Sequence, residues 1–290
     1  MKKFTILIPI FNDWESLEKL LNRINENIKD IKEAEFDCVI IDDCSSIKNP
    51  KIEVPPQIKL IKIIHMNKNR GHARCNAFGI KYLSENKNLD YLILMDGDGE
   101  DRPEEIKLLV AKVLSEPNKS VVAKRIKRSE GFLFQMLYRM HKWLTLLTTG
   151  KMINFGNYSC LTQSDIKKIS TKASLWSSYT GTFKKYIKNY NQVNSIRGTR
   201  YFGPSKMNFM NLIKHSLSII SVFRKTFLIR SALFIVIYIL LIKSNASITT
   251  SVPLILLLIA VYSVSNLALR ENMEEFKNSL SQIKDIEQIK

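Results

Sequence analysis

The sequence predicts an α/β fold with a mostly parallel central sheet, followed by amphipathic helices and a hydrophobic helical hairpin. Over the first 125 residues, short apolar runs alternate with stretches of helical periodicity. This alternation is typical of βαβ units. Polar clusters follow several of the apolar runs, at the positions where such sheets bind ligands. From residue 227 the chain becomes strongly hydrophobic, which predicts a membrane anchor.

The elements of the α/β part are predicted from the spacing of their apolar residues. Continuous apolar runs of four to eight residues favour buried strands, whereas apolar residues recurring every three or four positions favour helices. The predicted strands are residues 4–10, 36–41, 58–64, 91–95 and 121–123. The predicted helices are residues 14–28, 71–83 and 104–114.

The net charge indicates the class of binding partner, and the cysteine spacing indicates the redox compartment. The net charge is +17, from 44 Lys and Arg against 27 Asp and Glu, which points to an anionic partner. No recognisable nucleic-acid motif is present, so we expect phosphate ligands or an acidic membrane face rather than nucleic acid. The four cysteines have no CxxC spacing, which favours buried thiols in a reducing, cytosolic compartment.

An apolar run that ends abruptly in carboxylates is the strongest chemical signal. Asp96 and Asp98 follow the predicted strand at residues 91–95. Residues i and i+2 of a strand point the same way, so both carboxylates can converge on one cation. Hard divalent cations prefer such oxygens and in turn hold phosphates. An EF-hand loop is excluded, because the twelfth position counted from Asp96 is Lys107.

Two apolar stretches near the C-terminus are long enough to span a bilayer. The less favoured alternative is that both are helices buried in the core of the protein. The predicted spans are about residues 226–243 and 251–269. Basic residues flank the outer ends of the spans (Arg224, Lys225, Arg230 and Arg270), and the hairpin tip carries only Lys243. The positive-inside rule therefore places the α/β domain and both termini in the cytoplasm, at the inner membrane.

Several further motifs occur in a fixed order along the chain. They lie at residues 8–13, 39–45, 69–73, 95–98, 123–125, 156–161 and 200–206. Together they resemble the family 2 glycosyltransferases of the GT-A fold, and most nearly the type that acts on dolichyl or undecaprenyl phosphate. The resemblance covers roughly residues 1–225. Several members of that type carry four spans, whereas this chain shows two.

The resemblance implies a role for each matching residue. The nucleotide-sugar would be bound by Pro9, Phe11, Asp13, Ile41, Asp43, Asp96, Gly97, Asp98, Arg200 and Lys206. Mg²⁺ or Mn²⁺ would be held by Asp96, Asp98 and Glu100, and the acceptor phosphate by Arg125 and Arg128. The catalytic residues would be Asp96, Asp98 and Arg125. The family usually has Tyr and Glu where this chain has Phe11 and Asp13.

The expected organisation follows from the spans and the resemblance. Residues 1–205 would form the cytoplasmic catalytic domain, with an amphipathic interface segment at 131–149. Residues 206–225 would form a juxtamembrane amphipathic helix, 226–270 the hairpin and 271–290 a cytoplasmic tail. The partners would be a nucleotide-sugar, a polyprenyl phosphate and membrane lipids. The oligomeric state, including a homo-oligomer, is left open.

The expected reaction is metal-dependent, inverting transfer of a sugar from a nucleotide-sugar to a polyprenyl phosphate. Family members that act on hydroxyl acceptors often carry a catalytic acid downstream of the motif at 156–161, but residues 174–181 contain none. An ionised phosphate needs no strong base to act as a nucleophile. Two alternatives remain, namely transfer to a glycan or lipid hydroxyl and a non-catalytic, membrane-anchored nucleotide-binding protein.

Overall fold

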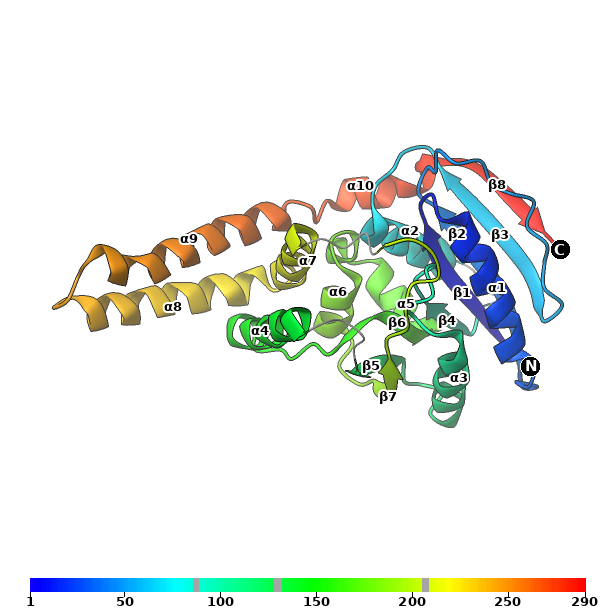
Figure 1. Ribbon diagram of the computed structural model, residues 1–290, viewed down its shortest axis with the longest axis horizontal. Coiled ribbons are helices and arrows are strands. Elements are labelled where there is room, and N and C mark those ends of the chain that lie inside the picture. Colours follow the sequence, from blue (N-terminus) through cyan, green and yellow to red (C-terminus); the bar gives the residue numbers. More distant parts are fainter. Residues whose placement is uncertain (86–88, 128–131, 205–208) are drawn as a thin grey trace.

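An eight-stranded mixed sheet forms the centre of the computed structural model, which describes residues 1–85, 89–127, 132–204 and 209–290 (Figure 1). The strand order is β7-β5-β6-β4-β1-β2-β3-β8. Strands β4, β1, β2 and β3 are parallel neighbours, as are β5 and β7, whereas β6 and β8 run antiparallel to their neighbours. The predicted α/β class with a mostly parallel centre is confirmed.

The strands and helices alternate through the first half of the chain, as the periodicity predicts. The strands are β1 (Lys2–Ile10), β2 (Ala34–Asp42), β3 (Ile58–Met66), β4 (Tyr91–Leu94), β5 (Val121–Lys127), β6 (Phe155–Thr162), β7 (Asn191–Ile196) and β8 (Ile283–Ile289). The helices of the α/β domain are α1 (Trp14–Ile28), α2 (His72–Ser84), α3 (Ile106–Ser115), α4 (Phe132–Thr149), α5 (Gln163–Ser170) and α6 (Tyr179–Tyr186). Short 3₁₀ helices lie at Pro103–Glu105, Ala173–Trp176 and Asn278–Gln282.

Both faces of the sheet are buried, which explains why its central strands are apolar without alternation. In β1, Ile6 and Ile8 belong to the cluster that contains the apolar faces of α1 and α3. Leu7 points to the opposite face and packs with α2, α5 and α6. The sheet is therefore sandwiched between two helical layers, and its polar ligands can bind only at the strand ends.

Helix α2 approaches β1 closely at Gly79. A Cβ atom placed on Gly79 would lie 2.5 and 2.6 Å from the two terminal methyl carbons of Leu7. We expect Gly79→Ala to destabilise the protein by about 1–3 kcal/mol through overpacking, although alanine itself favours a helix by about 1 kcal/mol. Chemical denaturation of the full chain in detergent measures this difference.

A second variant separates steric overlap from other causes of that loss. Leu7→Ala alone should cost about 2–5 kcal/mol, because it leaves a cavity in the core. In that background Gly79→Ala should become stabilising, since its methyl group occupies the space that Leu7 leaves. An equal cost of Gly79→Ala in both backgrounds would contradict the proposed overlap.

Two apolar helices, α8 (Arg224–Ile242) and α9 (Ile248–Ala268), project from the domain as an antiparallel hairpin (Figure 1). Both are long and apolar enough to cross a membrane, and little of their surface is buried. Helices α4 and α7 (Phe209–Ser221) lie at the base of the hairpin. Arg230 on α8 donates to the carbonyl oxygens of Leu146 and Leu147, at 3.3 and 2.7 Å, and so satisfies the C-terminal end of α4.

The segment after the hairpin folds back onto the domain, which the sequence analysis did not predict. It contains α10 (Met273–Lys277) and β8, and β8 pairs antiparallel with the edge strand β3. Figure 1 shows this segment crossing from the end of α9 to the far edge of the sheet. Both ends of the hairpin are thus joined to the same α/β domain.

Candidate functional site

Three loops meet where β1, β2 and β4 end, and Asn12 joins the first two of them. Its side-chain oxygen accepts hydrogen bonds from the backbone N–H groups of Ser46 and Ile47, at 2.8 and 3.0 Å. Its own N–H donates to Ser45 Oγ at 2.8 Å. Asn12 adopts a positive φ of 51°, which asparagine tolerates better than most residues. The loop after β1, which carries Asp13, is therefore fixed to the loop after β2.

Asp43 holds the loop that precedes α2. Its two carboxylate oxygens accept from the backbone N–H groups of Arg70 and Gly71, at 2.8 and 2.7 Å. Burial raises the pKa of Asp43, and these donors oppose that shift. Gly71 needs its φ of 87° to make this turn. A role of Asp43 in binding a nucleotide base stays a prediction, in which the remaining lone pairs of the carboxylate would take part.

Asp96 and Asp98 lie in a turn rather than on the strand. Because β4 ends at Leu94, strand alternation does not set the directions of their side chains. Asp96 Oδ1 lies 3.2 Å from His72 Nε2 and 3.2 Å from Asn157 Nδ2. Asp98 Oδ2 lies 2.9 Å from Arg200 Nη1. Both carboxylates thus sit among polar partners at the mouth of the sheet.

A third carboxylate, Asp101, is buried beneath this turn. It accepts from the backbone N–H of Asp96 at 3.0 Å and lies 3.6 Å from Arg125 Nη2. Burial, together with the Asp96 charge, raises the pKa of Asp101 to about 7, and burial with the Asp96 and Glu100 charges raises that of Asp98 to about 6. Although burial opposes it, His72 and Asn157 hold the pKa of Asp96 below its usual range. The turn therefore crowds three carboxylates together, and their mutual repulsion favours a bound cation.

This crowding of carboxylates fits a divalent cation. Among the described residues, no three His, Cys, Asp or Glu side chains form a preformed metal cage. Mg²⁺ is typically held by one or two carboxylates together with phosphates of the substrate. Asp96 and Asp98 would supply the carboxylates. Glu100, the third predicted ligand, instead forms an ion pair with Arg197. The donor set is thus compatible with a cation that shares its coordination with a phosphate ligand.

Two arginines contact the carboxylates of the acidic turn. Arg200 bridges Asp13 and Asp98, and its Nε donates to the carbonyl oxygen of Phe202 at 2.8 Å. Arg125 on β5 lies over Gly156, where a Cβ atom would come within 2.7 Å of its Nη2. The side chains of Arg125 and Arg200 are only 14% and 13% exposed. Such desolvated guanidinium groups bind phosphate oxygens strongly once their carboxylate partners are displaced.

The remaining predicted residues are distributed around this site. Pro9 and Ile41 are buried at the ends of their strands, so only their backbone atoms can face a ligand. Gly97 packs against the carbonyl oxygen of Pro9, and Phe11 lies in the loop after β1 with 41% of its surface exposed. Arg128 and Lys206 lie outside the described residues.

Three polar residues at the site were not predicted to have roles there. His72 opens α2, as its sequence position suggests, but its ring also contacts Asp96 and accepts or donates at 2.8 Å to Asn157. Asp101 anchors the turn from below. The positions of Asn157 and Asp101 within or beside the sequence motifs were a signal. The contact of Asn157 with Asp96 depends on β6 pairing with β4, whereas that of Asp101 with the Asp96 backbone is local.

Comparison with known proteins gives a consistent family. The model of the family described as Glycosyl transferase family 2 matches residues 5–177. A curated relative is the undecaprenyl-phosphate 4-deoxy-4-formamido-L-arabinose transferase of Photorhabdus laumondii subsp. laumondii, which is 28% identical over 222 residues. The alignment covers 73% of this chain and 65% of the relative, so the chain spans less than two thirds of the relative's length.

Solved structures share the fold at low sequence identity. Glucosyl-3-phosphoglycerate synthase from Mycobacterium tuberculosis, crystallised with Mn²⁺, UDP-glucose and phosphoglyceric acid, matches with a TM-score of 0.53 and 13% identity, over 78% of this chain and 79% of that chain. Mannosyl-3-phosphoglycerate synthase from Rubrobacter xylanophilus matches with a TM-score of 0.54 and 13% identity, over 76% and 72%. These matches identify the GT-A architecture of the α/β domain.

Proposed function

This chain belongs to glycosyl transferase family 2, and from that membership we propose that it moves a sugar from a nucleotide-sugar to a polyprenyl phosphate at the cytoplasmic face of the membrane. The observation that carries the proposal is the acidic turn at Asp96–Asp98 with Arg125 beside it, in a domain from which an apolar hairpin projects. The undecaprenyl-phosphate transferase similar to this chain supports the same acceptor class.

The donor would bind across the ends of β1, β2 and β4. Asp13 and Asp43 would contact the nucleoside, and Asp96 and Asp98 would hold Mg²⁺ or Mn²⁺ together with the diphosphate. When bound, such a cation stabilises negative charge on the departing nucleoside diphosphate. Arg200 would exchange its carboxylate partners for phosphate oxygens of the donor, because both kinds of partner suit the guanidinium fork.

The acceptor would approach from the side of α4 and the hairpin. Exposed apolar residues on α4 (Trp143, Leu144 and Leu147) suit a helix that lies in the membrane interface. Arg125, on the strand that precedes α4, would bind the lipid phosphate. That phosphate is ionised at neutral pH and attacks the anomeric carbon directly, which inverts the anomeric centre. Asp165 needs no role as a base in this scheme, and its carboxylate accepts from Ser120 at 2.6 Å.

A panel of nucleotide-sugars tests this proposal. Purified full-length protein is incubated with each radiolabelled donor, undecaprenyl phosphate and Mn²⁺, with Asp98→Ala as the blank. We expect one donor to yield a labelled lipid that mild acid hydrolyses, since glycosyl phosphates are acid-labile. Label in an acid-resistant lipid would instead indicate transfer to a hydroxyl group. Nucleotide binding without turnover of any donor would indicate the non-catalytic alternative.

A further inference from the structure

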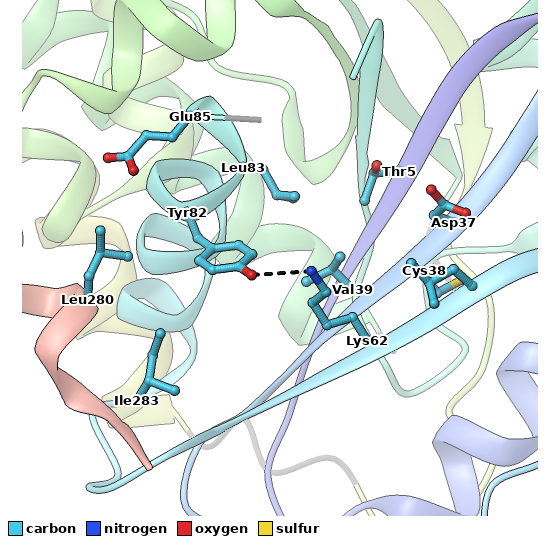
Figure 2. Close-up of a pocket in the computed structure, with 11 residues that line it drawn as sticks. Thr5, Asp37, Cys38, Val39, Lys62, Tyr82, Leu83, Glu85, Leu280 and Ile283 are labelled. Carbon is cyan, nitrogen blue, oxygen red and sulfur yellow. Dashed lines mark hydrogen bonds between the residues drawn. The ribbon is translucent and has the colours of Figure 1, made fainter. Parts of the chain in front are cut away.

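The segment that follows the hairpin packs directly against the elements that shape the donor site. Lys81 on α2 donates to the carbonyl oxygen of Phe276 at 3.0 Å, and its ammonium lies over the Phe276 ring. Figure 2 shows Leu280 and Ile283 of this segment across a cleft from Tyr82 on α2. The returning segment is therefore part of the folded domain, and its side chains are fixed relative to α2.

Glu275 on α10 is the centre of a dense polar cluster. Its carboxylate accepts from the Arg70 guanidinium, lies 3.2 Å from Arg74 Nη2, and accepts from Trp176 Nε1 at 2.9 Å. Its side chain is 25% exposed, and those of Arg70 and Arg74 are 19% and 20% exposed. One carboxylate thus pairs with two partly buried arginines and reduces the repulsion between them.

Hydrogen bonds hold the loop at residues 67–72 on two sides. On one side, Arg70 Nη2 donates to Gln282 Oε1 at 2.9 Å, and the backbone N–H of Asn67 donates to the Gln282 carbonyl oxygen at 2.9 Å. On the other side, Asp43 accepts from the backbone of Arg70 and Gly71. The loop then leads into His72, whose ring contacts Asp96.

From these contacts we propose that Glu275 is a positioning residue for the donor site. It acts through Arg70, which presents the 67–72 loop to Asp43 and sets the start of α2 beside the acidic turn. The assignment rests on the proposed function, because it treats the ends of β1, β2 and β4 as the place where the nucleoside diphosphate binds. The segment after the hairpin thereby links the membrane anchor to the donor pocket.

The test uses full-length protein in detergent and three variants. Glu275→Gln removes the charge, Glu275→Asp keeps it but shortens its reach, and Glu274→Gln changes the exposed neighbouring carboxylate as a matched control. Binding of UDP and GDP with Mn²⁺ is measured by calorimetry, together with donor KM and kcat. Hydrogen exchange of the peptide covering residues 67–72 gives a readout that needs no ligand.

We expect Glu275→Gln to weaken nucleoside diphosphate binding and raise donor KM about tenfold, as for loss of one charge-assisted hydrogen bond. Amide exchange at residues 67–72 should accelerate, while kcat changes little. Glu275→Asp should fall between Glu275→Gln and wild type, and Glu274→Gln should match wild type. Wild-type exchange at 67–72 in Glu275→Gln would overturn the proposal, as would an equal loss in Glu274→Gln.

Measurements on the wild-type protein distinguish failure of this inference from failure of the proposed function. If the wild-type protein binds neither UDP nor GDP and transfers no sugar, the proposed function fails. Unchanged binding in Glu275→Gln, alongside an active wild type, contradicts only the positioning role. A uniform fall in kcat and unfolding temperature, without a change in donor KM, would assign Glu275 to general stability and reject its role at the donor site.

Discussion

Replacing Asp98 by asparagine should lower sugar transfer by a factor of about 10³, which is the scale of loss when a group that stabilises transition-state charge is removed. Asparagine keeps the size of the side chain and its capacity to accept a hydrogen bond from Arg200, which lies 2.9 Å away. It removes the negative charge that would hold a divalent cation against the donor diphosphate. The radiolabel transfer assay measures the effect directly.

A carboxylate at the opposite end of the same strand provides the control. Asp90 precedes β4 and accepts from the backbone N–H of Lys3 at 2.9 Å, far from the acidic turn. Asp90→Asn should therefore leave transfer within about twofold of wild type, as expected for a surface substitution. Chelation with EDTA should abolish wild-type activity, and Mn²⁺ or Mg²⁺ should restore it. Full activity of Asp98→Asn, or in EDTA, would contradict a cation at this turn.

The sequence is most informative about the centre of the sheet. Strands β1, β2 and β4 are buried on both faces over most of their length, so their apolar runs are visible without knowledge of the fold. The ends of β1, β2 and β4 carry Asp13, Asp43 and Asp96, and parallel pairing brings these ends to one edge. Local pattern and tertiary pairing agree there, which is why the location of the candidate site could be predicted.

The edge strand β8 shows where such prediction fails. Its apolar residues Ile283, Ile286 and Ile289 are three positions apart, which favours a helix rather than a strand. Most of its side chains are exposed, so burial leaves no alternating pattern to detect. The strand exists because β3, more than 200 residues earlier in the chain, offers an open edge. Its partner, and not its own residues, determines its conformation.

Contacts within the site could be predicted less well than its location. The sequence analysis places Asp96 and Asp98 just after the strand and applies strand alternation to them, but β4 ends at Leu94 and a turn sets their directions. The contacts of His72 and Asn157 with Asp96 depend on how α2 and β6 dock, which no local spacing encodes. Such contacts are set by tertiary packing, and a functional site gathers more of them than the core does.

Replacing Arg125 by alanine should lower transfer to the lipid phosphate by about 10²-fold, since a desolvated guanidinium contributes more to phosphate binding than an exposed one. Arg125→Lys should recover only part of the activity, because an ammonium group lacks the planar fork that binds two phosphate oxygens. Lys124→Gln is the matched control, since adjacent strand residues point to opposite faces of the sheet. The KM for undecaprenyl phosphate is the decisive measurement.

A change at Gly156 tests the position of Arg125 without altering its charge. A methyl group there would lie 2.7 Å from Nη2 and 3.0 Å from Cζ of Arg125, so the guanidinium must move. Gly156→Ala should therefore raise acceptor KM in the same direction as Arg125→Ala but by less, and the two effects should not add. Because Arg125 also faces Asp101, it could alternatively serve the donor side. A rise in donor KM with acceptor KM unchanged would assign it there and leave the acceptor phosphate to other residues.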